Sequence, residues 1–415
     1  RGEAPKESPL ASCRGPRWWL LAWISLFIMI FVLGSYPAEM ARRLFAQGVP
    51  AAEIDFRVFW AAARLAAEGR PLAAFDPAMM EAVHGVWPDE GGWMPWLYPP
   101  GYLLLLTPLG LLPFLPAWAI FTALSLAAYG AAVRPFCRGA PALWVTMALA
   151  PALLPALTQG QNSLFWAAGL MATLSALRAG RDGLAGGILG LMTLKPQLGL
   201  MIPFALLGAG RWRAIAAAIV ATALIAALPT LLYGADYWSA TLAVLDRHRE
   251  VMIDELPGLT LMTSLASMLA GIGLPVAGAL AIQWLVAAIA AVAVALAWRH
   301  ASFDLAAAIL ILATLLASPY LWHNEAVLMP LAGLFMLRSG VLRIDRPGVA
   351  IFLLLWAGAF PIIATPSFFD ASDPLIPPRN WVVPVILLAF ALCLRRLLAV
   401  LRAGRATPST FPEEP

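Results

Sequence analysis

Long apolar runs, separated by short loops that carry arginine, recur along the whole chain. A run of about twenty apolar residues crosses the hydrocarbon core of a bilayer as a helix. Backbone groups in lipid have to be hydrogen-bonded internally, so only helices or a closed barrel can span it. The runs lack the two-residue alternation of barrel strands, and 61% of the 415 residues are hydrophobic while 12% are charged. The sequence therefore predicts an all-α polytopic membrane protein and excludes a soluble fold.

The arginines predict how the chain is threaded, because positive residues accumulate in cytoplasmic loops. The apolar runs between the basic clusters give about 12 spans, near 18–36, 99–133, 142–157, 162–177, 183–195, 197–209, 214–232, 275–298, 303–317, 324–337, 348–365 and 381–401. Both ends then lie inside, with cytoplasmic tails over 1–17 and 402–415 and a single transmembrane domain over 18–401. We expect a multi-pass protein of a bacterial-type plasma (inner) membrane.

Some runs fit this threading poorly. The run at 99–133 is long and contains Leu112-Pro113, and we interpret it as one span plus a surface or broken helix. The run at 259–272 is interpreted as a half-span. The pair 183–195 and 197–209, interrupted at Lys195-Pro196, is too short for two full crossings, which predicts local thinning, tilt or a recessed cavity.

The first run, at 18–36, is too long for a signal-peptide core and lacks a small-residue cleavage site. We therefore expect it to remain as an anchored first span.

The two largest outer loops are predicted over 37–98 and 233–258. In the first, Phe56, Phe59 and Trp60 recur at helical spacing after a charged start, which predicts an amphipathic helix lying in the membrane interface with its aromatic face among lipid headgroups.

Asp55 begins that helix and allows two interpretations. Aspartate is a preferred N-cap, so its carboxylate could accept backbone N–H bonds from the first turn. Alternatively, a carboxylate partly desolvated at headgroup level has a raised pKa and can accept a proton from a hydroxyl group.

Further polar residues interrupt the apolar sequence on the same predicted outer side. Gln159, Gln161 and Asn162 lie in a tight turn between two runs and can either cap helix ends or hydrogen-bond a sugar or phosphate. Lys195, followed by Pro196 and Gln197, is the only lysine after Lys6. An ionisable residue at a helix break is a functional candidate, with a snorkelling interface lysine as the alternative.

The helix expected after Pro196 would aim its positive end at an anion, so that Lys195 and this helix end could hold a phosphate. His323 lies in another outward-facing break and could contact a phosphate oxygen or relay a proton, although a lone histidine is more often structural.

Other classes of partner have no support in the sequence. Cys13, Cys137 and Cys393 match no metal motif and the four histidines are scattered, so we expect no metal site and no cofactor. The modest net charge of +4 resides in short loops beside spans, so we expect no nucleic-acid partner.

Several short motifs occur in a fixed order: Asp55-Phe56, Tyr98-Pro99-Pro100, Gly160-Gln161-Asn162, Lys195-Pro196 and Trp322-His323-Asn324. Together they resemble the membrane proteins of glycosyltransferase family 87 (DUF2029), of the GT-C superfamily, over about residues 20–400. The resemblance implies a GT-C-like helical bundle and a transferase that uses a polyprenyl-phosphate-linked sugar, with mannose or arabinofuranose as donor sugars and a glycolipid or glycan acceptor at the outer, periplasmic face.

The resemblance also implies roles for individual residues. The first-loop aspartate is the expected general base, which is Asp55 here, in an inverting displacement. The donor phosphate and sugar would then contact Lys195, His323, Gln159, Gln161, Asn162, Gln197 and Tyr98. A transporter or flippase of lipid-linked sugars is the alternative, but mid-span ionisable residues are nearly absent. A non-catalytic assembly subunit would leave Asp55 and Lys195 without a role.

Overall fold

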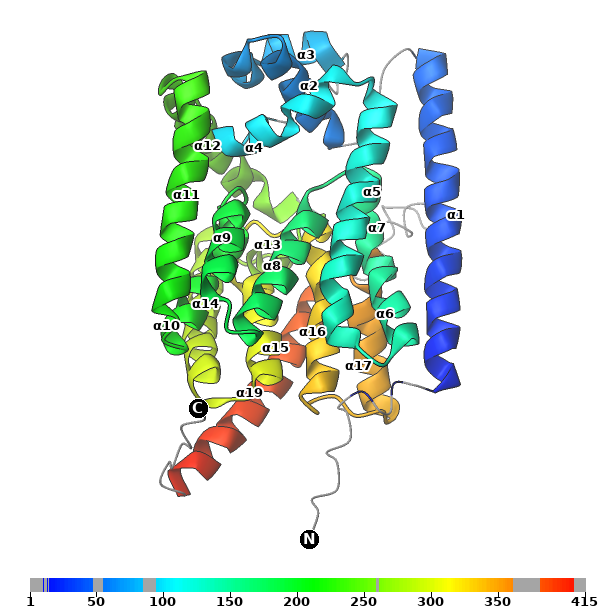
Figure 1. Ribbon diagram of the computed structural model, residues 1–415, viewed down its shortest axis with the longest axis vertical. Coiled ribbons are helices and arrows are strands. Elements are labelled where there is room, and N and C mark those ends of the chain that lie inside the picture. The colour runs from blue at the N-terminus through cyan, green and yellow to red at the C-terminus, as the bar shows by residue number, and fades with distance from the viewer. Residues whose placement is uncertain are drawn as a thin grey trace.

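The computed structural model describes residues 10, 13, 15–47, 55–84, 95–258, 261–360 and 381–406, and the regular secondary structure in this part of the chain is helical apart from one isolated β-bridge. The first half contains α1 (Pro16–Gln47), α2 (Phe56–Ala67), η2 (Pro71–Phe75), α3 (Pro77–His84), α4 (Pro100–Leu106), η3 (Thr107–Leu111), α5 (Phe114–Val133), α6 (Pro141–Ala148), η5 (Pro151–Leu153), α7 (Leu154–Gln159), α8 (Ser163–Arg178), α9 (Asp182–Met192), η6 (Pro196–Gly199) and α10 (Ile202–Gly208). The second half contains α11 (Trp212–Tyr233), α12 (Asp236–Glu255), α13 (Leu265–Gly271), α14 (Val276–His300), α15 (Phe303–Ala317), η8 (His323–Leu328), α16 (Met329–Arg338), α17 (Arg346–Ala357) and α19 (Val382–Ala406) (Figure 1).

Six helical segments within the described residues are long and apolar enough to cross a membrane: Pro16–Ser35, Phe114–Cys137, Pro141–Gln159, Trp212–Tyr233, Val276–His300 and Val382–Ala403. The about 12 spans expected from the sequence are therefore not confirmed. Several apolar runs form shorter helices instead, including α9, α15 and α17. The last part of the predicted span 348–365 lies outside the described residues.

Proline accounts for part of this difference, because it lacks a backbone N–H and disfavours helix in the residue before it. The run at 99–133 is divided at Leu112-Pro113, where η3 ends and α5 begins. The run at 183–209 is divided at Pro196, which opens the four-residue η6. The result is a bundle that combines long, membrane-length helices with shorter, interrupted ones.

Large apolar side chains point outward from the long helices. Phe27 on α1 is 70% exposed and Leu231 on α11 is 84% exposed. Only 6% of the most apolar window of α11 is buried inside the protein. Apolar surface on this scale is unstable in water but matches lipid tails. The protein is thus a multi-pass membrane protein.

A layer of short helices, α2 to α4, covers one end of the bundle (Figure 1). The predicted amphipathic helix is present as α2, but its aromatic face does not lie in headgroups. Phe56 and Phe59 are 0% and 3% exposed and pack against Phe114, Phe121 and a cluster of tyrosine and tryptophan rings. The amphipathic pattern correctly identified an apolar face, but the face is covered by α4, η3 and α5 rather than by lipid.

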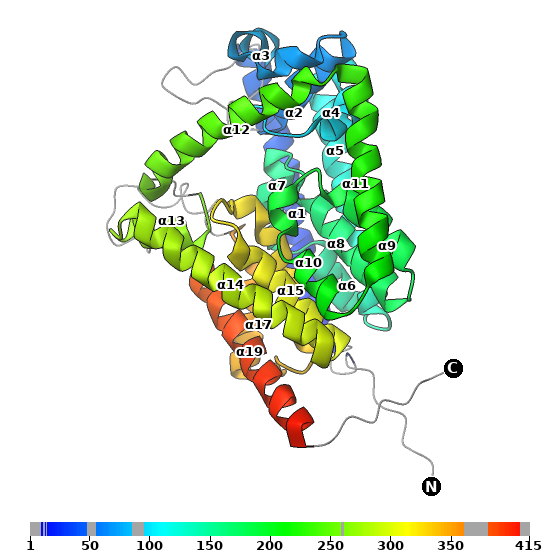
Figure 2. The ribbon, with the colours of Figure 1, turned by 90° about the vertical axis from the view of Figure 1, so that its left-hand side faces the viewer.

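The opposite end of the bundle holds the start of α1 and the end of α19 (Figure 1). Helix α12, which occupies most of the predicted loop 233–258, crosses from the top of α11 toward the short helix α13 (Figure 2). The predicted half-span at 259–272 contains α13, which has seven residues.

Candidate functional site

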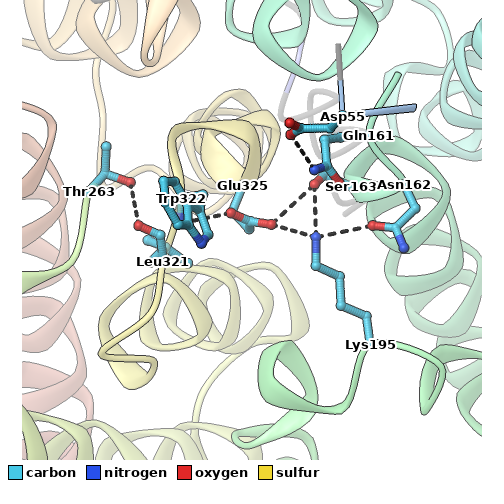
Figure 3. Close-up of polar contacts among 9 residues, drawn as sticks. All are labelled: Asp55, Gln161, Asn162, Ser163, Lys195, Thr263, Leu321, Trp322 and Glu325. Atoms are coloured by element: carbon cyan, nitrogen blue, oxygen red, sulfur yellow. Dashed lines mark hydrogen bonds and ion pairs between the residues drawn. The ribbon is translucent and has the colours of Figure 1, made fainter. Parts of the chain in front are cut away.

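Asp55 lies directly before α2, but its carboxylate does not cap that helix. The backbone oxygen of Asp55 accepts the bond from Val58 N–H at 3.0 Å, which begins the helix without the side chain. The carboxylate instead accepts a hydrogen bond from Gln161 Nε2 at 2.6 Å (Figure 3). Of the two interpretations of Asp55, side-chain N-capping is therefore wrong.

The turn after α7 brings Gln161 to Asp55 because Gly160 allows a close approach. Gly160 has φ +66°, in the left-handed region that glycine adopts without steric cost. A Cβ at this position would lie 2.5 Å from the Cβ of Phe56. The turn thus packs directly on the first residue of α2, and Gln161 follows within reach of the carboxylate.

Lys195 lies at the break between α9 and η6 and is buried. Its ammonium forms an ion pair with Glu325 Oε1 at 2.6 Å, and the two side chains are 8% and 4% exposed. The same ammonium donates to Asn162 Oδ1 at 3.1 Å and to Ser163 Oγ at 3.3 Å. Lys195 therefore joins the turn that holds Asp55 to the segment 322–328 (Figure 3).

Glu325 is the part of the site that the sequence analysis missed. Its Oε1 also accepts from Ser163 Oγ at 3.2 Å, and its Oε2 accepts from the backbone N–H of Trp322 at 2.9 Å. The signal was present, since a carboxylate in an apolar segment is a functional candidate by the reasoning applied to Lys195. His323, two residues earlier, was considered in its place.

A short antiparallel contact fixes the segment that carries Glu325. Met262 and Trp322 form an isolated β-bridge, with Thr263 N–H bonded to Leu321 O at 2.6 Å and His323 N–H to Leu261 O at 3.0 Å. Segments from both sides of α14 and α15 thereby hold the loop in place.

The remaining predicted residues are placed differently. His323 is buried at the start of η8, and its Nδ1 has no hydrogen-bond partner among the described residues. Gln159 is half-buried with its Oε1 likewise unpaired in that part of the chain, and Gln197 is exposed. The structure therefore gathers Asp55, Gln161, Asn162 and Lys195 into one cluster but does not bond Gln159, Gln197 or His323 to it.

Tyr98 stands close to this cluster, in the segment before α4. Its ring packs on Phe59 and Tyr102, at centroid distances of 5.2 and 4.7 Å. Burial raises the pKa of the Tyr98 hydroxyl, and the charge of Lys195 and a hydrogen bond with Asn162 act in the opposite direction. The hydroxyl is thus within the electrostatic range of the lysine.

The expected helix N-terminus beyond Pro196 is not present. η6 has four residues, and α10 begins only at Ile202 and has seven. Aligned peptide dipoles sum over several turns, so neither element supplies the positive helix end that the sequence suggested. Of the two groups that the sequence suggested for holding a phosphate here, the structure retains Lys195.

The electrostatics suit Asp55 for proton transfer. Burial raises the pKa of its carboxyl above the ordinary range, while the hydrogen bond from Gln161 and the charges of Arg57 and Lys195 lower it. A carboxylate with a raised pKa is a better proton acceptor, and a buried ammonium nearby can stabilise an anion. Within the described ranges, no three His, Cys, Asp or Glu side chains come together in a way that could hold a metal ion.

A model of glycosyltransferase family 87 matches residues 96–319, which is more than half of the chain. The chain belongs to glycosyltransferase family 87. The match includes Gln161, Asn162 and Lys195, whereas Asp55 and Glu325 lie outside it. The resemblance noted from the short motifs is thereby confirmed.

Two curated proteins are also similar to this family 87 member. Both are named Alpha-(1->3)-arabinofuranosyltransferase and come from two strains of Mycobacterium tuberculosis. Each is 33% identical over 163 residues, covering 35% of this chain and 37% of the relative. The chain therefore matches little more than a third of the length of these relatives. No solved structure matches the chain. Family membership and the apolar helices together identify a membrane protein of glycosyltransferase family 87.

Proposed function

We propose that this membrane glycosyltransferase transfers a sugar from a polyprenyl-phosphate donor to a hydroxyl group of a glycolipid or glycan at the outer face of the membrane, with inversion at the anomeric carbon. Asp55 is the general base and Lys195 binds the donor phosphate. Arabinofuranose and mannose are the proposed donor sugars, the first supported by the activity named for the mycobacterial relatives.

The observation that carries this proposal is the side-chain hydrogen bond between Gln161 and Asp55. A helix-capping aspartate would be bonded to its own first turn, yet this carboxylate is held at 2.6 Å by an amide about a hundred positions away in the chain. The next residue, Asn162, is bonded to Lys195. Two neighbouring residues of one turn, Gln161 and Asn162, are thus bonded to a proton acceptor, Asp55, and to a cation, Lys195.

The proposed reaction is a direct displacement with one base. Asp55 accepts the proton of the acceptor hydroxyl while the oxygen of that hydroxyl forms a bond to the anomeric carbon. The bond between that carbon and the phosphate oxygen breaks, and its electron pair leaves with the lipid phosphate. Phosphate is a stable leaving group, so the step needs charge stabilisation more than a general acid.

Lys195 would supply that stabilisation from a fixed position. Glu325, Asn162 and Ser163 take up the three N–H donors of its ammonium, so the group is already oriented, and a donor phosphate would displace one of these partners. Pre-organised charges are effective because they do not have to reorient during the reaction. Glu325 is therefore a positioning residue, acting through the lysine.

The test uses purified full-length protein with labelled polyprenyl-phosphate mannose or arabinofuranose and membrane lipids as acceptors. Asp55→Asn keeps the size of the side chain and removes the base, which contributes about 10²- to 10⁴-fold to a rate. We expect transfer to fall by at least about a hundredfold with donor binding retained. Asp254→Asn, on the exposed face of α12, is the matched control and should transfer normally.

Two results would contradict the proposal. Undiminished transfer by Asp55→Asn would remove Asp55 as the base. Movement of lipid-linked sugar across proteoliposome membranes, without formation of a glycosidic bond by the unmodified protein, would instead identify a flippase.

A further inference from the structure

A basic cavity lies at the end of the bundle away from the Asp55 cluster. Its volume is about 660 Å³, and it is lined by residues from the start of α9, the loop between α10 and α11, the end of α14 and the start of α15. Arg211 contributes from the loop, Trp212 and Arg213 from the start of α11, and Trp298 and Phe303 from the other side.

Two helices lead from this cavity toward the cluster. α9 begins at the cavity with Asp182 and ends shortly before Lys195, so the two sites lie about 16 Å or more apart along its 11 residues. α15 likewise begins at the cavity and leads into the segment that carries Glu325. The cavity is therefore on the opposite side of the bundle, the side that the basic loops predict to be cytoplasmic.

The backbone makes this cavity favourable for an anion. Helices α9, α11 and α15 have 11, 22 and 15 residues, and each has its N-terminal end in the lining. The start of a helix carries unsatisfied N–H groups and a partial positive charge. The partial positive charges of three helix N-termini around one cavity add to each other.

The side chains leave net positive charge at the same place. Arg211 is paired with Asp182 at 3.1 Å, which neutralises the carboxylate in the lining. Asp304, on the first turn of α15, is held by Arg338 at 2.9 Å. Arg213 is exposed in the lining, and the guanidinium of Arg178 lies over the ring of Phe303. Two arginines thus remain that no carboxylate neutralises among the described residues.

Trp298 adds a hydrogen-bond donor. Its indole N–H is buried and has no partner in the described part of the chain, and its ring packs edge-on against Phe303 at 5.9 Å. A buried polar group without a partner costs free energy. Because this nitrogen is closed to solvent, a ligand oxygen in the cavity would bond to it only after the ring turns toward the cavity.

The surroundings indicate a lipid rather than a free ion. Trp212 is 65% exposed beside the cavity, as expected of a tryptophan at a membrane–water interface. From there α11 presents apolar side chains outward, among them Ile219 at 65% and Leu224 at 66% exposure. A headgroup in the cavity could therefore continue into acyl chains along α11.

We propose that this cavity, lined by Arg213 and Trp298, binds the phosphate of an anionic phospholipid headgroup from the membrane leaflet opposite the Asp55 cluster. This site is independent of the transferase reaction. Basic pockets between membrane helices are known to hold anionic headgroups in this way.

The test compares phospholipids that differ only in charge. Purified full-length protein in detergent is incubated with phosphatidylglycerol or phosphatidylcholine of identical acyl chains, and bound lipid is measured by native mass spectrometry. We expect preferential retention of phosphatidylglycerol. Arg213→Gln should weaken its binding about fivefold, the effect of one basic residue near an anionic headgroup, and Trp298→Phe should weaken it while keeping the ring.

Arg395→Gln is the matched control, because it removes an exposed arginine from α19 outside the lining. It should bind phosphatidylglycerol like the unmodified protein. Equal retention of both lipids, or equal weakening by Arg395→Gln and Arg213→Gln, would overturn the proposal. A separate arm adds inorganic phosphate alone: stabilisation by this ion, with no preference for phosphatidylglycerol, would overturn the assignment to a lipid.

Discussion

The buried pair of Lys195 and Glu325 can be tested by a double-mutant cycle. The two side chains are 8% and 4% exposed and their charged atoms are 2.6 Å apart. Removing one partner of such a pair leaves an uncompensated buried charge, which costs about 3–5 kcal/mol. Replacing both partners by neutral groups often costs little. The variants Lys195→Met and Glu325→Gln should therefore each destabilise the protein more than the double variant does.

The assay is the free energy of unfolding in detergent micelles, measured by denaturant titration of all four proteins. We expect a coupling energy of about 3 kcal/mol or more between the two positions. The exposed pair Arg249 and Asp246 on α12, 3.0 Å apart, is the matched control and should show no measurable coupling. Additive effects of Lys195→Met and Glu325→Gln would refute the reasoning.

The same four proteins separate stability from function. The double variant should be folded and close to the unmodified protein in stability, yet it lacks the ammonium that we propose binds the donor phosphate. We expect it to bind a polyprenyl-phosphate sugar poorly and to transfer slowly. Full transfer by this variant would leave Lys195 with a structural role only.

Two further predictions concern the turn at 160–162. Because burial raises the pKa of Asp55, the base form is lost as pH falls through that raised pKa, and kcat/KM should fall at a pH above the ordinary aspartate range. Gln161→Leu removes a hydrogen bond that lowers this pKa, so it should move the acid limb of the pH profile to higher pH; a shift to lower pH would contradict the assignment. Gly160→Ala should lower the free energy of unfolding by more than about 1 kcal/mol, because its Cβ would meet Phe56 at 2.5 Å. The same clash should also slow transfer. Gly180→Ala, with φ +67° and open space around it, is the control for the left-handed backbone conformation alone. Equal decreases in the thermal stability of the two variants would show that the contact with Phe56 is unimportant.

The sequence predicted the helical membrane fold because apolar length is a property of each segment by itself. It could not predict how many runs form complete spans. Whether a run is divided, as at Leu112-Pro113, depends on which neighbours satisfy the freed backbone groups. Nor could it say what covers Phe56 and Phe59, since an amphipathic pattern shows that a face is apolar but does not distinguish lipid from protein.

The candidate site was predictable to the extent that polar residues stand out in apolar sequence. Asp55, Gln161 and Lys195 were identified in this way, and they lie together in the structure. Glu325 was missed although it too is an ionisable residue in apolar sequence, because His323 was considered as the functional residue of that segment. His323, the more conspicuous residue of the same segment, is not bonded to the cluster.

The pattern of bonds in the cluster supports the proposed reactive site over a purely structural role at the helix interruptions. All the contributing segments lie at helix ends or interruptions, where freed backbone groups inside a membrane protein need partners. Yet most of the polar side chains bond to one another: Gln161 to Asp55, and Lys195 to Glu325. Of the cluster's carboxylate oxygens, Glu325 Oε2 is the one that accepts a backbone N–H, that of Trp322, within the described residues. Side chains that only repaired the breaks would be bonded to backbone. If the cluster is a reactive site, the Lys195→Met/Glu325→Gln variant should be stable but inactive.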